Sequence, residues 1–197
     1  MLLAWAMVTM TGTTLLTQTA GAADAPKAAP AAASAAASAP AEGVRQALFE
    51  PFTAAQDLVR AKKYAEARAK LAEIEATPGL SPYEAYQLDR LQLTTAVGLN
   101  DGAAAQTLYD RVVASGRLTE AELVPLLYNV MVAAYRADDH ARAAAAAAKA
   151  RVQPAMDADM RAQARQIQIQ SLYLGKDYPA AARELEADFT SLRAAGK

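Results

Sequence analysis

Apolar positions beyond residue 43 follow helical spacing, and their pattern returns every 38 residues. The clearest column is a small residue three positions after a turn: Ala67, Ala105, Ala143 and Ala181. Three further columns keep the same phase: Leu58, Ala96, Ala134 and Leu172; Ala55, Leu93, Met131 and Ile169; Leu71, Tyr109, Ala147 and Leu185. Large apolar residues share these columns with alanine, so an alanine-rich composition does not account for them. The pattern predicts four copies of one unit, at 43–80, 81–118, 119–156 and 157–194.

Signals for helix starts recur at the same interval. Ser81 opens a capping box with Pro82 at the first helical position, and Thr119 opens a second box. Asp157 is the next N-cap candidate, and Gly43 is the position one interval before Ser81. Within three of the units an aspartate also stands at the start of a second helix: Asp101, Asp139 and Asp177. We therefore expect two helices in each unit. Residues 82–99 are the first helix of the second unit, and residues 64–76 are the second helix of the first unit.

Two features complicate this helical prediction. Residues 166–173, QIQIQSLY, alternate with period two, which in isolation indicates a strand, but the repeat phase places them in a helix. Pro51 and Pro125 fall inside predicted first helices and are expected to kink them or shift their starts. The small alanines allow the paired helices to approach closely. We therefore expect an all-α fold, an α-solenoid of four antiparallel helix pairs.

The first 42 residues differ from the rest. Residues 1–23 carry no charge and contain the small-x-small sequence Ala20-Gly21-Ala22, which predicts an export signal at 1–22, removed by cleavage after Ala22. The alternative is an uncleaved N-terminal membrane anchor. Residues 23–42 are rich in Ala, Pro and Ser and predict a disordered linker. These expectations place the mature protein in the periplasm.

Composition excludes several classes of function. With 20 basic and 21 acidic residues, the chain has no net field that attracts nucleic acid, and with no cysteine it forms neither disulfides nor a thiol nucleophile. The single histidine, His140, lies in a turn beside two aspartates, which is weak support for a metal site. No phosphate-binding glycine loop or nucleophile elbow is present. We expect a non-catalytic protein without a cofactor or metal.

Two segments resemble the tetratricopeptide repeat family most closely: residues 61–67, AKKYAEA, and residues 175–181, GKDYPAA. The turn tyrosines Tyr64 and Tyr178 and the small alanines match that family, although its repeat has 34 residues. The resemblance implies stacked helix pairs that bind proteins, as in exported members of the family in Gram-negative bacteria. Peptide C-terminus capture is not expected, because the regular Asn and Lys residues of the family's carboxylate clamp are missing.

The resemblance also implies a binding groove lined by the first helices of the units. Its phase selects twelve residues: Phe52, Gln56, Arg60, Arg90, Thr94, Tyr128, Val132, Tyr135, Arg136, Gln166, Gln170 and Tyr173. Aromatic, amide and arginine side chains suit an extended peptide or a helix. The alternative is that these residues partly serve packing and that partners bind elsewhere.

Two functions remain open: an exported interaction module that scaffolds an envelope complex or holds a peptide, and a helical accessory part of a larger envelope enzyme or assembly. In the last helix Leu185, Phe189 and Leu192 form an apolar stripe. The stripe predicts either a longer protein or self-association through the C-terminal repeat.

Overall fold

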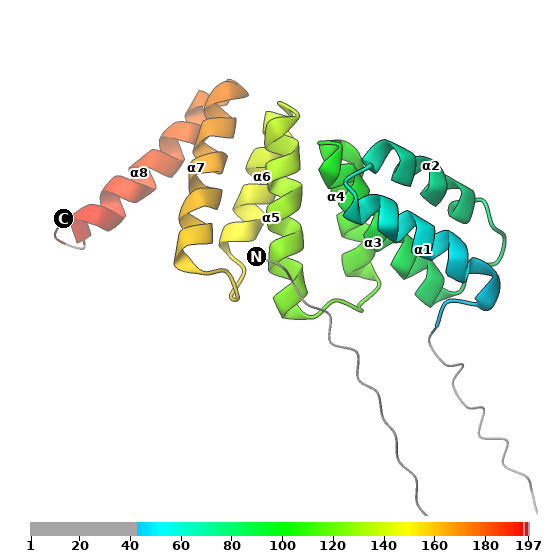
Figure 1. Ribbon diagram of the computed structural model, residues 1–197. Helices are drawn as coiled ribbons and strands as arrows, with labels where there is room; N and C mark the ends of the chain where they lie inside the picture. The colour runs from blue at the N-terminus through cyan, green and yellow to red at the C-terminus, as the bar shows by residue number, and fades with distance from the viewer. Residues whose placement is uncertain (1–42, 195, 197) are drawn as a thin grey trace, which may run out of the picture. The chain divides into compact units, whose positions relative to one another are not determined.

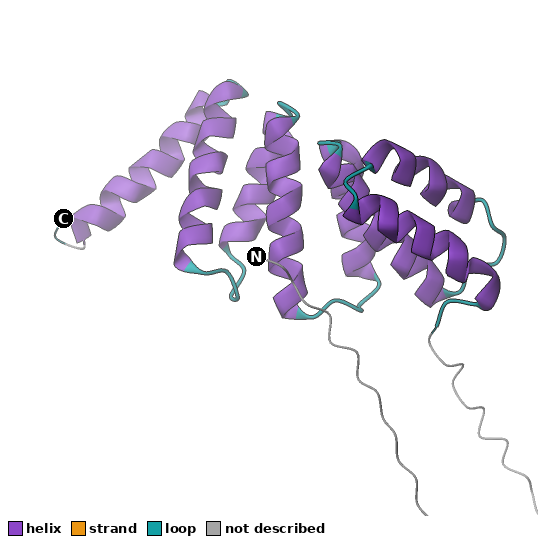
Figure 2. Cartoon of the chain, viewed as in Figure 1, coloured by secondary structure: helices purple, strands orange, loops and turns teal. Residues whose placement is uncertain are grey.

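The computed structural model describes residues 43–194 and 196, and every regular element within them is a helix (Figures 1 and 2). The eight helices are α1 (Gln46–Arg60), α2 (Tyr64–Glu75), α3 (Pro82–Gly98), α4 (Gly102–Ala114), α5 (Glu120–Arg136), α6 (His140–Arg151), α7 (Ala158–Leu174) and α8 (Tyr178–Ala194). The all-α prediction is confirmed for these residues, including the alternating segment 166–173, which lies within α7. The predicted signal and linker, 1–22 and 23–42, lie outside the described residues.

Consecutive helices pack against one another throughout this part of the chain (Figure 1). The odd-numbered helices also contact each other in order, α1 with α3, α3 with α5 and α5 with α7. The even-numbered helices behave differently. Among the described helices, the backbones of α4 and α6 come close, whereas those of α2 and α4, and those of α6 and α8, do not. Two openings therefore remain between even-numbered helices, one between α2 and α4 and one between α6 and α8.

Most helix starts follow the predicted caps. The Ser81 side chain accepts a hydrogen bond from the Glu84 amide at 3.1 Å, and Asp157 accepts one from the Met160 amide at 2.7 Å. The prediction of Gly43 as the first N-cap is wrong, because α1 begins after Arg45. The Arg45 amide donates to Glu84 Oε1 at 2.9 Å, so a contact with α3 decides where α1 starts.

The two internal prolines leave the helix bounds almost unchanged. Pro51 and Pro125 each occupy the sixth position of α1 and α5, and both helices continue through them. A proline cannot donate to the carbonyl four residues earlier, which belongs here to Ala47 or Ala121. Both of these alanines are exposed in the first helical turn, where water can donate a hydrogen bond to the free carbonyl instead. The expected shift of a helix start does not occur in α5, which follows Thr119 directly.

The turn within each helix pair has the same geometry four times. A non-glycine residue takes a left-handed conformation, with φ between 54° and 63°, at Lys62, Asn100, Asp138 and Lys176. The following amide donates to the carbonyl five residues earlier at 2.9–3.0 Å, which is the Schellman arrangement. In the last three turns the donor is the aspartate that caps the next helix: Asp101, Asp139 and Asp177.

Small residues bring the helices together. Ala67, Ala105 and Ala143 are fully buried, and Ala181 is 5% exposed. Gly102 at the start of α4 lies so close to α5 that a Cβ atom there would sit 2.7 Å from the Cα of Ala134. The buried apolar residues form one cluster over α1–α3 and a larger one over α3–α7. The four left-handed turns and these close contacts together determine where each helix lies relative to the next.

Candidate binding groove between α2 and α4

The helices α2 and α4 both lie on α3 but do not touch each other, and a groove of about 500 Å³ separates them. Helix α3 supplies its floor, and α2 and α4 supply its walls. Arg142 of α6 closes one end. This volume lies within the range of ligand-binding pockets in proteins.

The floor and lower walls of the groove are apolar. They consist of Leu71 and Ala72 from α2, Ala96 and Leu99 from the α3 region, and Ala104 and Leu108 from α4. Thr95 also lies on the floor, but its hydroxyl donates to the Leu91 carbonyl at 2.8 Å. Because that hydroxyl is satisfied within its own helix, the floor offers an incoming chain mainly apolar contacts.

One end of the groove is lined by the Glu75 carboxylate and the Arg111 guanidinium. Glu75 accepts a hydrogen bond from Gln92 Nε2 at 2.8 Å, and one turn along α3 Asp89 lies 2.7 Å from Arg111 Nη2. The Oδ1 atom of Asp89 is buried and makes no aligned hydrogen bond. Burial raises the pKa of the Asp89 carboxyl and Glu75 adds to the rise, while Arg111 only partly opposes it. Asp89 does not itself line the groove, so Glu75 is the carboxylate that an incoming cationic group would meet at this end, beside the Arg111 guanidinium that is paired with Asp89.

The opposite end is basic. Arg68 of α2 lines it and forms no ion pair with any residue that the structure describes. Arg142 is paired with Asp139, and the Asp101 side chain caps α4. The groove therefore combines an apolar floor with unlike charges at its two ends.

None of the twelve residues predicted for a groove lines this one. Phe52 is 3% exposed and belongs to the core cluster of α1–α3, so it is not available at a surface. The others lie on the odd-numbered helices and are half-buried or exposed: Gln56, Arg60, Arg90, Thr94, Tyr128, Val132, Tyr135, Arg136, Gln166, Gln170 and Tyr173.

Some of these side chains contact one another. The Tyr135 hydroxyl donates to Gln170 Oε1 at 3.2 Å, and the Tyr128 hydroxyl donates to Gln163, so α5 and α7 are joined by two tyrosine–glutamine hydrogen bonds. Arg90 pairs with Glu122 at 3.3 Å. These contacts occupy hydrogen-bonding groups that the prediction had assigned to a bound partner.

A second opening lies between α6 and α8, over α7, with a volume of about 430 Å³. Four alanines of α6 form one wall: Ala141, Ala144, Ala145 and Ala148. Two polar atoms at this opening, Nδ1 of His140 and Oγ of Ser171, are buried without a hydrogen-bond partner in the described structure.

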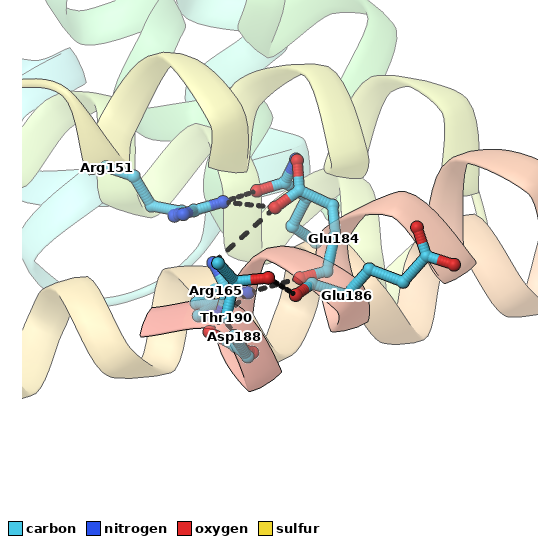
Figure 3. Close-up of polar contacts among 7 residues, drawn as sticks. Arg151, Arg165, Glu184, Glu186, Asp188 and Thr190 are labelled. Carbon is cyan, nitrogen blue, oxygen red and sulfur yellow. Dashed lines mark hydrogen bonds and ion pairs between the residues drawn. The ribbon is translucent and has the colours of Figure 1, made fainter. Parts of the chain in front are cut away.

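Charged side chains connect α6, α7 and α8 beside this second opening. Figure 3 shows Arg151 from α6 and Arg165 from α7 converging on Glu184 of α8, and Arg165 also reaches Asp188. Gln168 accepts from Arg151 and donates to Glu184 at 3.0 Å. Because the arginines and carboxylates satisfy one another, this cluster ties α8 to α6 and α7 rather than offering a free charge.

Sequence reasoning missed the groove because its walls lie on the even-numbered helices and its floor on a side of α3 that the prediction did not select. The available signal was the presence of Leu99 and Leu108 outside the predicted core columns.

Among the described residues, no group of three His, Cys, Asp or Glu side chains is arranged to hold a metal ion. No helix in that part of the chain has the length and apolar character needed to cross a membrane.

Comparison of the chain with protein families, with curated proteins and with solved structures finds no match.

Proposed function

We propose that this protein is a non-catalytic interaction module that binds an amphipathic segment of a partner protein in the groove between α2 and α4. The observation that carries the proposal is the groove itself, an apolar floor of helix surface between two helices that do not meet. Such a shape accommodates a helix or a short peptide that buries one apolar face. The proposal moves the binding site from the odd-numbered helices to the even-numbered side.

The proposed architecture is an α-solenoid of helix pairs with a 38-residue period, similar to tetratricopeptide repeats. The helix starts support it, because α3, α5 and α7 begin at Pro82, Glu120 and Ala158. The four identical left-handed turns support it as well. In such an array each unit buries its apolar face against its neighbours, and open surfaces between units serve for binding.

The charges at the groove ends suggest the chemistry of the bound segment. A basic side chain of the partner would lie near Glu75, and an acidic side chain would lie near Arg68. Apolar side chains between them would cover Leu71, Leu99 and Leu108. The charged contacts set the direction of the segment, while the apolar contacts supply most of the affinity.

We further propose that this binding takes place outside the cytoplasm, in the periplasm. This part of the proposal is supported by the sequence of residues 1–22, with its uncharged apolar stretch and its Ala20-Gly21-Ala22 site.

A pair of matched substitutions tests the site. Ala72→Trp places a large side chain in the groove from an exposed position on α2, while Ala69→Trp makes the same change on the same helix at an exposed position that does not line the groove. Partner recovery is measured by crosslinking pull-down from cells with each variant at equal expression. We expect Ala72→Trp to reduce recovery at least ten-fold and Ala69→Trp to leave it unchanged.

A third variant tests the odd-numbered helices directly. Tyr135→Ala combined with Arg136→Ala removes two of the originally predicted binding side chains. If this variant loses the partner while Ala72→Trp retains it, the groove between α2 and α4 is not the site.

A further inference from the structure

The last helix pair leaves uncovered a position that the earlier pairs bury. Leu71, Tyr109 and Ala147 occupy this position in α2, α4 and α6 and are 1%, 6% and 0% exposed. Each belongs to a cluster that includes residues of the following odd-numbered helix. Leu185 holds the same position in α8 and is 45% exposed. The side of α8 that carries it lacks a covering helix among the described residues.

Four more large aromatic and apolar side chains are exposed on α8 and at the end of α7. Tyr178 is 53% exposed and Phe189 is 74% exposed, and both lie on the same stripe of α8. Tyr173 and Leu174 at the end of α7 are exposed as well, and the Tyr173 ring meets the Tyr178 ring edge to face at 5.4 Å. We call these five residues the α8 end face. The Leu192 side chain lies outside the described part of the chain.

The other end of the helix array, on α1, carries acidic side chains besides one exposed aromatic ring, that of Phe49. Glu50, Ala54 and Asp57 occupy exposed positions on α1. In α3 the residues 38 positions later are Leu88, Gln92 and Thr95, and two of these, Leu88 and Thr95, are 2% exposed. An acidic surface on α1 is a poor cover for an apolar face, so head-to-tail stacking of copies is disfavoured.

We propose that the α8 end face pairs with the same face of a second copy of this chain, about a two-fold axis. A two-fold interface joins identical surfaces and closes after two subunits, which fits an array whose broad apolar surface lies at one end. This proposal does not depend on the groove between α2 and α4, which lies on other helices.

Charge supports an antiparallel crossing of the two α8 helices. Glu186 and Arg193 are exposed, flank the stripe, and form no ion pair with other described residues. Glu186 lies three residues before Phe189 and Arg193 lies four residues after it. If the helices cross antiparallel near Phe189, Glu186 of each copy faces Arg193 of the other, which gives two equivalent ion pairs.

The available area sets the strength of this dimer. A fully exposed aromatic side chain offers about 150–250 Å², and the five residues at their observed exposures offer roughly 500–600 Å² per copy. The pair would bury about 1,000–1,200 Å², at the lower limit for a specific interface. We therefore expect a weak, reversible dimer.

Sedimentation velocity of the full chain from about 1 to 500 μM measures this equilibrium. Phe189→Glu should raise the dissociation constant at least ten-fold, whereas Phe49→Glu, the same change at an exposed position on α1 (64% exposed), should change it less than two-fold. Glu186→Arg should weaken the dimer, and adding Arg193→Glu should restore it. Circular dichroism checks that each variant remains helical.

Three results would overturn the proposal. The first is a wild-type chain that stays monomeric at about 500 μM. The second is a dimer that Phe189→Glu leaves intact. The third is a Phe49→Glu variant that weakens the dimer as much as Phe189→Glu does, because the contact then does not lie on the α8 end face.

Discussion

The acid stability of this protein should depend on one buried carboxylate, Glu84 in α3. Its Oε1 atom accepts hydrogen bonds from the Arg45 amide at 2.9 Å and from Arg45 Nε at 3.0 Å, and Oε2 accepts from the Ser81 amide at 2.8 Å. The Glu84 side chain is 3% exposed, while that of Arg45 is 41% exposed. One carboxylate thus completes the cap of α3 and holds the start of α1.

These contacts determine how the stability changes with pH. Burial alone would raise the pKa of Glu84, but the hydrogen bonds from Ser81 and Arg45 and the Arg45 charge outweigh it and lower the pKa from 4.5 to about 2. A carboxyl with a lowered pKa stabilises the fold above its unfolded pKa, and this contribution is lost as the pH falls from about 4.5 to about 2. The shift corresponds to at most about 3 kcal/mol. Because solvent screens the exposed Arg45, we expect roughly 2 kcal/mol.

The substitution Glu84→Gln keeps the size of the side chain and removes its charge. Urea unfolding at pH 7 should show a loss of roughly 2 kcal/mol. The loss should shrink toward zero near pH 2, where the wild-type carboxyl is itself about half protonated in the folded protein. Glu122→Gln is the matched control in the second capping box, since Glu122 also binds the Thr119 amide but is 38% exposed. Its cost should stay below about 1 kcal/mol. An equal loss for Glu84→Gln at pH 7 and near pH 2 would refute the reasoning.

Four other predictions follow from the packing, the turns and the N-terminal sequence. Ala105→Leu should lower the free energy of unfolding by about 1–3 kcal/mol, because Ala105 is fully buried between helices, whereas the exposed Ala103→Leu should cost less than about 0.5 kcal/mol; equal urea midpoints would contradict this packing. Lys62→Gly should raise thermal stability by about 0.5 kcal/mol, since glycine relieves the left-handed conformation at φ 58°; a lower melting temperature would count against it. Asp89→Asn should leave the free energy of unfolding at pH 7 unchanged or raise it, because burial raises the pKa of Asp89 and so disfavours its charged form. A marked loss in urea titrations would show that Arg111 compensates the charge fully. Mass spectrometry of the protein from the periplasm should find Ala23 as its first residue, and an intact Met1 in the membrane fraction would favour the uncleaved anchor.

Local sequence signals predicted the helices well because caps and turns act within a few residues. Asp157 could be recognised as an N-cap because its side chain needs only the amide three residues on, and the structure has that bond. The start of α1 could not be predicted in this way. It depends on Arg45 reaching Glu84, a residue 39 positions away, and no local pattern encodes that contact.

The location of the groove could not be predicted from the sequence for a similar reason. Whether two even-numbered helices meet depends on the tilt of each pair, which many contacts set together. Helix α6 presents alanine at most positions and meets α4, whereas α2 and α4 carry Leu71 and Leu108 and remain apart. Leu185 illustrates the same limit, since the repeat phase marks it as a core position but burial also requires a neighbour to cover it.

Site-specific photo-crosslinking in cells tests the central claim, that a partner binds between α2 and α4, most directly. A photoreactive residue is introduced at Ala72 in the groove, at Ala69 outside it, or at Tyr135 on the odd-numbered helices, one position at a time. The account predicts a crosslinked partner from Ala72, with none from Ala69 or Tyr135. A partner captured from Tyr135 and absent at Ala72 would contradict it.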